Sequence, residues 1–190
     1  VIYTSFANSN TGVYLPVDSM EQLQKVVDGK LLEYNEVYAM MDLVLFQQAA
    51  EHICRISRIV NTPSGNAMLI GVGGSGKQSL TRISAFVANM ACLSIEINRG
   101  YGINEFREDI KKFMVKTGVD GEDTVFLFTD SQIVNETMLE DLNNVLNTGE
   151  VANLFPQDET DHIASDMIPV CAADGITETR DNCLAHFVSR

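Results

Sequence analysis

The residues of this chain best suited to chemistry form a glycine-rich stretch that ends in a lysine and a glutamine. Residues 71–78, which we call the glycine loop, read Gly-Val-Gly-Gly-Ser-Gly-Lys-Gln and follow the phosphate-binding pattern G-x-x-x-x-G-K-[ST] except at the last position. Glycine has no Cβ, so backbone N–H groups can turn inward around a phosphate while Lys77 adds positive charge. The sequence therefore predicts a nucleotide-phosphate site formed by Gly71, Gly73, Gly74, Ser75, Gly76, Lys77, Gln78 and Ser79.

The segments on either side of the glycine loop have the patterns that such a site requires. Residues 67–70 form an apolar run typical of a buried strand, and helical spacing after the loop relates Leu80, Ile83, Val87 and Met90. The N-terminus of that helix would point free N–H groups and the positive end of its dipole at a bound anion. A glycine turn that binds nothing is the alternative.

Position 78 departs from the phosphate-binding pattern. The usual Ser or Thr there offers a hydroxyl to Mg²⁺, whereas Gln78 is longer and a weaker metal ligand. Ser79 is a neighbouring candidate for the same role. The sequence therefore supports nucleotide binding better than metal-dependent hydrolysis, and the need for Mg²⁺ stays open.

Strands and helices are predicted to alternate through the middle of the chain. We expect a strand over 92–97, a helix over 103–117 and a strand over 124–130. With 67–70, this order predicts an α/β fold in which helices flank a parallel sheet and ligands bind at the carboxyl ends of its strands. Asp130 ends the last strand, where its carboxylate would face Mg²⁺ or an attacking water. The alternative is an Asp that caps the next turn.

A further helix leads into the glycine loop and offers a candidate for base recognition. It is predicted to begin at Asp42 and to continue to Val60. Apolar residues at the start of such a helix can form an adenine slot. The candidates are Leu43, Val44, Leu45 and Phe46, and burial in the helix core explains their apolar character equally well.

Other segments carry weaker patterns. Residues 19–29 open with the spacing of a capping box and are predicted to form a short helix, whereas 31–41 is ambiguous. Helical spacing returns over 136–146, and Asp181 would cap a final helix. Residues 168–171 are expected to be extended.

Length and composition limit the class of protein. With 190 residues, 45% of them hydrophobic, the chain can bury a sizeable core. A formal net charge of −13 argues against direct binding to nucleic acid or an acidic membrane surface, and no stretch is long enough to span a bilayer. The cysteines lack metal-site spacing and are expected to be reduced thiols in an intracellular compartment: Cys54, Cys92, Cys171 and Cys183.

We divide the chain into an N-terminal extension over 1–41, which packs on the core, and an α/β region over 42–190.

Several long segments carry a recognisable family pattern, in a fixed order along the chain. They are residues 43–46 with 52–56, 65–82, 126–133 (Phe-Leu-Phe-Thr-Asp-Ser-Gln-Ile) and 143–155. Together they resemble the dynein heavy chain of axonemal type, specifically the large subdomain of the fourth AAA+ module of its motor ring. The likeness covers at least residues 31–155.

The resemblance implies an AAA+ core of the P-loop NTPase class, truncated before the sensor strand, whose loop holds ATP or ADP. Gln78 falls at the Mg²⁺-ligand position, where axonemal members often have Gln. Thr129 and Asp130 fall where an adjacent acidic pair is usual. An alternative register places Asp130 at the metal-binding acid and Ser131 at the catalytic acid. In both registers one carboxylate replaces two, which predicts slow or absent hydrolysis.

The function implied by the resemblance is a regulatory nucleotide-binding module of a microtubule motor that drives ciliary or flagellar movement. Its partners would be the neighbouring AAA+ modules of the same heavy chain. Intermediate chains, light chains and microtubules would be reached only through the intact motor, in the cytoplasm, at the cytoskeleton of the axoneme. Two alternatives remain: an active ATPase module, in which Asp130 activates water, and a structural ring segment with a vestigial loop. Because the chain starts without Met and ends inside an amphipathic segment, we expect an excerpt of a larger protein.

Overall fold

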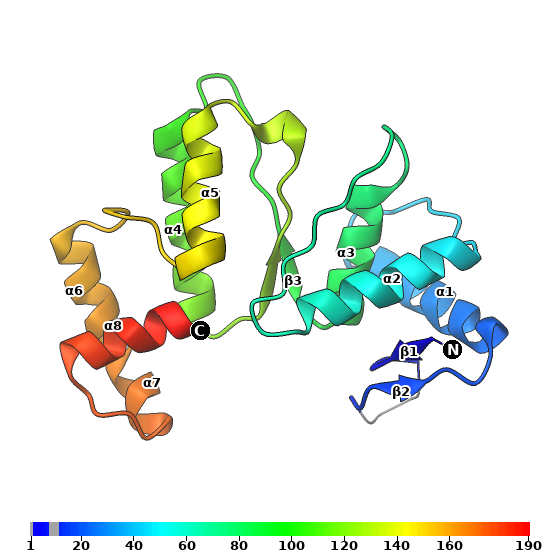
Figure 1. Ribbon diagram of the computed structural model, residues 1–190, viewed down its shortest axis with the longest axis horizontal. Coiled ribbons are helices and arrows are strands. Elements are labelled where there is room, and N and C mark those ends of the chain that lie inside the picture. Colours follow the sequence, from blue (N-terminus) through cyan, green and yellow to red (C-terminus); the bar gives the residue numbers. More distant parts are fainter. Residues whose placement is uncertain (1, 8–11) are drawn as a thin grey trace. The chain divides into compact units, whose positions relative to one another are not determined.

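The computed structural model of the protein describes residues 2–7 and 12–190 (Figure 1). The chain folds into two compact units. The first unit is Val1–Cys92 and the second is Leu93–Arg190. Helices predominate in both units, and the strands are short. Within the described residues, no helix is long and apolar enough to cross a membrane, and no cluster of three or more His, Cys, Asp or Glu side chains could hold a metal ion.

The described residues of the first unit form one strand pair and three helices around an apolar core. The strands β1 (Tyr3–Thr4) and β2 (Leu15–Pro16) pair antiparallel, and they are followed by α1 (Met20–Val37), α2 (Gln47–Val60) and α3 (Lys77–Val87). The helices bury their apolar faces against one another, and the fully buried centre contains Leu23, Val27, Ala50, Ile53 and Ile83. Helix α1 and the glycine loop therefore belong to the same unit.

Helix α1 begins as predicted and continues beyond its predicted end. The hydroxyl of Ser19 caps it by accepting a hydrogen bond from the Gln22 amide at 3.1 Å. The helix runs to Val37 rather than ending near Gly29, because Tyr34 extends its buried face by nearly two more turns. Glycine inside a helix costs about 1 kcal/mol, and burial of an aromatic side chain outweighs that cost.

The strand expected over 67–70 is not formed, which corrects the prediction of a buried strand before the glycine loop. Met68 and Ile70 are 87% and 85% exposed, and no described strand pairs with this segment. A strand is stable only where a neighbour satisfies its backbone N–H and C=O groups and covers its side chains. In the described part of the first unit, β1 and β2 pair with each other, so the apolar run has no such neighbour.

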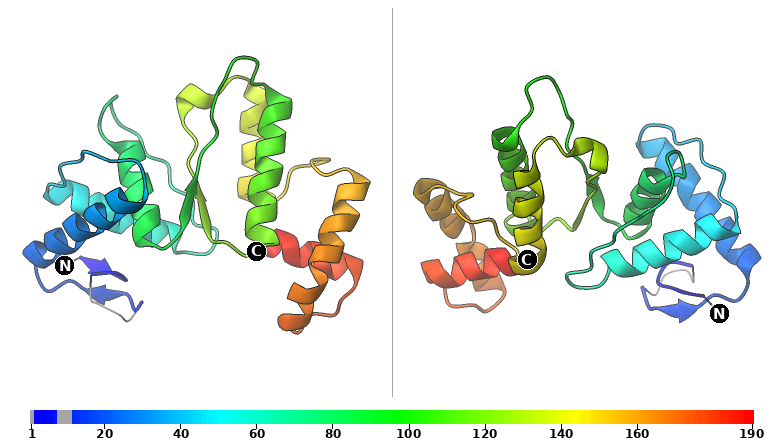
Figure 2. Two further views of the ribbon diagram at one scale, coloured as in Figure 1. Left: turned by 180° about the vertical axis from the view of Figure 1, so that it is seen from behind. Right: turned by 45° about the horizontal axis from the view of Figure 1, so that its top comes forward.

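The second unit opens with two short strands and two long helices. The strand β3 (Ala91–Leu93), which ends on the first residue of this unit, pairs with β4 (Thr124–Phe126). Between and after them come α4 (Ile103–Gly118), the 3₁₀ turn η1 (Asp130–Gln132) and α5 (Glu136–Thr148). Figures 1 and 2 show α4 and α5 side by side, and Phe106, Ile110 and Met138 are buried between the elements of this unit. The helices agree with the prediction, whereas the sheet is narrower than the one expected.

Three shorter helices complete the second unit: α6 (Gln157–Asp166), α7 (Ile168–Ala173) and α8 (Arg180–Ser189). The prediction that 168–171 is extended is wrong, because these residues form the first turn of α7. Pro169 is tolerated there, because the N–H groups of a helix's first turn have no acceptor within the helix and proline's lack of an N–H costs no hydrogen bond. Cys171 then lies fully buried in a core shared with α6 and α8.

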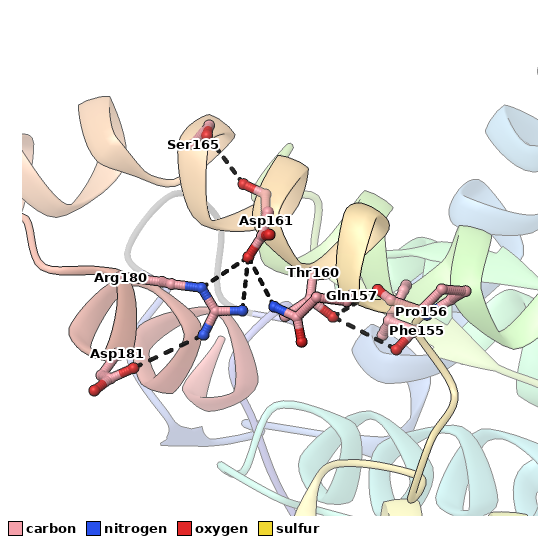
Figure 3. A network of polar contacts seen from close by, with 8 residues as sticks. All are labelled: Phe155, Pro156, Gln157, Thr160, Asp161, Ser165, Arg180 and Asp181. Atoms are coloured by element: carbon pink, nitrogen blue, oxygen red, sulfur yellow. Dashed lines mark hydrogen bonds and ion pairs between the residues drawn. The ribbon is translucent and has the colours of Figure 1, made fainter.

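A polar network joins α6 to α8 at the surface of this unit (Figure 3). The guanidinium of Arg180 contacts Oδ1 of Asp161 through Nε at 2.8 Å and through Nη2 at 2.7 Å. The side chain of Gln157 donates to the same oxygen at 3.0 Å. Because both members of the ion pair are exposed, we expect the pair to contribute little at neutral pH.

The stabilisation by this network is predicted to depend on pH. The hydrogen bond from Arg180 is the largest cause that lowers the pKa of Asp161 below its ordinary value of 3.8. A carboxyl whose pKa is lower in the folded state stabilises the fold above its unfolded pKa and loses that contribution as the pH falls through the folded pKa. We therefore expect Arg180→Ala to lower the thermal midpoint slightly at pH 7. The difference from the wild type should begin to shrink near pH 3.8 and disappear only below the lowered pKa of the folded state.

Circular dichroism of the 190-residue chain over a pH series measures this difference. Arg99→Ala, which removes another exposed arginine of the same unit, is the matched control and should show no such pH dependence. A midpoint difference for Arg180→Ala that is the same at pH 7 and at low pH would contradict the assigned ion pair.

Candidate functional site: the glycine loop

The glycine loop leads directly into the first turn of α3. Gly74 and Gly76 have φ angles of +75° and +74°, a left-handed conformation that glycine adopts at little cost. Gly76 is the N-cap of α3, and its carbonyl accepts a hydrogen bond from the Leu80 N–H at 2.8 Å. The N–H groups of the first helical turn, which begins at Lys77, have no acceptor within the helix and are therefore available to a ligand.

The side chain of Lys77 folds back onto the loop. Its Nζ donates to the carbonyl oxygens of Gly71 and Val72, both at 2.8 Å, and to Oγ of Ser75 at 3.2 Å. A Cβ at Gly71 would lie only 3.2 Å from the same Ser75 oxygen, so glycine leaves room for the Ser75 hydroxyl beside the lysine. All three acceptors are uncharged, and a phosphate oxygen would make a stronger, charge-assisted hydrogen bond with the ammonium.

The donors of the loop suit an anion better than a metal ion. A Cβ placed at Gly73 or Gly74 would meet no atom within 4 Å, so this part of the loop is open. Backbone N–H groups and one ammonium are the groups that bind phosphates at helix N-termini. Gln78 is exposed and Ser79 is half-buried, and their neutral oxygens are weak ligands for Mg²⁺.

The residues proposed for base recognition are not helical, because α2 begins at Gln47 instead of Asp42. Burial alternates along the segment: Met41, Leu43 and Leu45 are buried or half-buried, and Asp42, Val44 and Phe46 are exposed. This period of two is that of an extended backbone. Leu45 is 6% exposed and part of the core, whereas Phe46 is 60% exposed. A Cβ at Gly76 would lie 3.7 Å from Cδ1 of Leu43, so this segment borders the glycine loop.

Asp130 begins the turn η1 of the second unit, and its exposed carboxylate makes no hydrogen bond to any described residue. Gln132 holds this turn in place. Its Oε1 accepts hydrogen bonds from the Thr129 amide at 2.8 Å and the Thr129 hydroxyl at 3.1 Å. Its Nε2 donates to Oγ of Ser94 at 3.1 Å and to the Ile95 carbonyl at 2.6 Å. The turn is thereby tied to the residues that follow β3.

The sequence analysis overlooked Gln132, although a signal for it was present. Thr129 and Gln132 have the Ser/Thr-x-x-Glu/Gln spacing of a capping box, in which the two side chains bond to each other's backbone. The first unit holds both the glycine loop and the segment 41–46. Asp130 belongs to the second unit, so its pairing with the glycine loop stays a prediction.

The cysteines of the first unit are poorly suited to catalysis. All four are free thiols. Burial raises the pKa of Cys54 to about 11 and also raises that of Cys92, although Arg82 partly offsets the second shift. Thiols with raised pKa values hold little of the nucleophilic thiolate at neutral pH. We therefore assign neither of these two cysteines a catalytic function.

Comparison with known proteins identifies the family. The family described as "P-loop containing dynein motor region D4" matches residues 41–190. The chain is 48% identical over 177 residues to the dynein alpha chain of the flagellar outer arm of Chlamydomonas reinhardtii, and 41% identical over 193 residues to dynein axonemal heavy chain 1 of Homo sapiens. These alignments cover 93% and 100% of this chain and 4% of each relative.

A third relative, the dynein-1-beta heavy chain of the flagellar inner arm I1 complex of Chlamydomonas reinhardtii, is 45% identical over 185 residues. That alignment covers 96% of this chain and 4% of the relative. The chain thus spans about 4% of the length of the curated relatives it matches. The family match extends over most of the chain and includes both the glycine loop and Asp130. This protein belongs to the dynein heavy-chain family, within its D4 motor region.

Proposed function

We propose that this chain is a nucleotide-binding module of an axonemal dynein heavy chain, specifically the large subdomain of the fourth AAA+ module, and that its glycine loop binds ATP or ADP. The observation that carries the proposal is the meeting of the Lys77 ammonium, the left-handed glycines Gly74 and Gly76, and the N-terminus of α3 at one loop. Each of these groups favours an anion. On binding, Lys77 exchanges its uncharged loop acceptors for phosphate oxygens.

The module is proposed to regulate the motor rather than to drive it. Gln78 stands where a hydroxyl usually binds Mg²⁺, and Asp130 is the only carboxylate in the stretch Thr129-Asp130-Ser131. A bound nucleotide supplies the phosphates, and Asp130 would polarise water or hold a metal ion with no second acid to assist it. Hydrolysis at this site would consequently be slow or absent, and bound nucleotide would modulate coupling to the neighbouring AAA+ modules.

The relatives suggest where such a module works. Their names place them in flagellar outer and inner arms and in axonemes. We propose the same location for this protein, in a motor that reaches microtubules, intermediate chains and light chains only as an intact assembly.

Photoaffinity labelling of the complete protein that carries this sequence tests nucleotide binding at this particular loop. The probe is 8-azido-ATP, and mass spectrometry identifies the labelled peptides. We expect label within residues 41–82 that excess ATP or ADP removes and that depends little on Mg²⁺. Absence of label from this segment, in a preparation whose other nucleotide sites are labelled, would contradict the proposal. Label that disappears when Mg²⁺ is chelated would instead favour an active ATPase site.

A further inference from the structure

The extended segment before α2 is held by side chains of α1. Asn35 bonds to both polar groups of the Met41 backbone: its Oδ1 accepts from the Met41 N–H at 2.8 Å, and its Nδ2 donates to the Met41 carbonyl at 3.2 Å. The carboxamide thereby imitates the pairing of one strand residue with another. This contact fixes the chain immediately before residues 42–46, which were predicted to start a helix and instead precede it.

A second side chain of α1 holds the other end of the segment. The amide of Gln24 donates to the carbonyl of Leu45 and also to Oδ1 of Asp28. Gln24 and Asn35 are separated by about 16 Å along a helix, at about 1.5 Å a residue. Met41 and Leu45 are separated by about 13 Å in an extended chain, at about 3.3 Å a residue. The two spans are similar, so the segment runs antiparallel along α1.

These two anchors are the only hydrogen bonds, among the described residues, to the backbone of 41–45. Leu43 lies midway between them and approaches the glycine loop at Gly76. Val44 and Phe46 belong to the same short segment, and their side chains are exposed to solvent. The position of this apolar segment beside the phosphate residues therefore depends on α1.

We propose that Asn35 is a positioning residue for base recognition: by fixing Met41 it holds the apolar segment 41–46 in place for the purine ring of a nucleotide whose phosphates occupy the glycine loop. The inference rests on the proposed function of that loop. It gives the N-terminal extension a part in ligand selection, in addition to packing on the core. If Asn35 has this role, the loop binds an adenine nucleotide more tightly than it binds the same phosphates without a base, and this difference in affinity depends on Asn35.

Loss of Asn35 should weaken base recognition without affecting phosphate binding. A segment released from its anchor must be ordered when the base binds, and ordering of flexible residues lowers affinity. We expect Asn35→Ala to lower the affinity for ADP about tenfold while the affinity for inorganic pyrophosphate stays unchanged. Helix α1 itself should not suffer, because alanine is a better helix former than asparagine.

The experiment measures how ADP and pyrophosphate compete with 8-azido-ATP for label within residues 41–82 of the complete protein. The ratio of the two competition constants cancels any change in the affinity for the probe. Asn35→Asp, which keeps the acceptor for the Met41 N–H and loses the donor, should give an intermediate ratio. Glu36→Ala, at the next and exposed position of α1, is the matched control and should leave the ratio unchanged.

The outcomes separate this inference from the function on which it rests. Wild-type label that neither ADP nor pyrophosphate displaces would contradict the loop as a phosphate site. Displacement by both ligands in the wild type, with an unchanged ratio in Asn35→Ala, would overturn the positioning role alone. An equal fall in both affinities would do the same, because it would indicate general damage to the unit. Gln24→Ala, which releases the other end of the segment, should reproduce the selective loss of ADP affinity.

Discussion

Replacement of Lys77 by alanine is expected to lower the nucleotide affinity of the glycine loop by about 100-fold or more. Charge-assisted hydrogen bonds contribute about 1.5–3 kcal/mol each, and about 2.7 kcal/mol corresponds to a hundredfold change. The substitution should not unfold the unit, because Nζ contacts only exposed loop atoms and alanine suits the first turn of α3. Label from 8-azido-ATP within residues 41–82 of the complete protein measures the effect.

Two matched variants accompany this substitution. Lys25→Ala removes an exposed lysine from α1 and should leave the label unchanged, which separates the local role of Lys77 from the loss of one positive charge. Lys77→Arg retains the charge but places a bulkier, planar group against Gly71 and Val72, so we expect only partial recovery. If Lys77→Ala labels as strongly as the wild type and ATP displaces the label equally well, Lys77 does not bind the phosphates.

The second large effect is predicted for the ion pair between α4 and α5. Arg107 binds Asp141 through two parallel contacts, Nε to Oδ2 at 2.7 Å and Nη2 to Oδ1 at 3.1 Å. Asp141 is 4% exposed, whereas the Arg107 side chain is 38% exposed. Arg107→Ala would leave a buried carboxylate without its partner, and breaking a fully buried pair in this way costs about 3–5 kcal/mol. Because solvent reaches Arg107, we expect about 2–3 kcal/mol here.

Hydrogen exchange of the amides of α4 and α5 in the complete protein reports this loss as local opening. The expected cost corresponds to exchange about 30- to 150-fold faster in Arg107→Ala. Asp141→Ala should have a smaller effect, since the freed guanidinium can turn to water. The paired change Arg107→Met with Asp141→Leu should recover much of the protection, because apolar groups can replace a buried ion pair. Equal effects of the two alanine substitutions would contradict this account.

Local patterns in the sequence were sufficient for the features that depend on neighbouring residues. The glycine loop, the Ser19 cap and the helices α4 and α5 were all predicted at or near their observed positions. Each arises from contacts a few residues apart: a positive φ that requires glycine, a hydroxyl beside a free N–H, or apolar side chains recurring every three or four residues. Such contacts are specified by spacing alone.

Features that join distant residues were decided only by the tertiary structure. Residues 42–46 were expected to be helical and are not, and the side chain of Asn35 holds the backbone of Met41 immediately before them. Residues 67–70 have an apolar pattern typical of a strand but lack a described partner, and a strand without a partner leaves its backbone polar groups unsatisfied. The sequence alone thus determined which residues form the glycine loop and predicted that they bind phosphate. The packing of α1 against the residues before α2 decided what lies beside that loop, since hydrogen bonds between distant segments leave no periodic pattern in the chain.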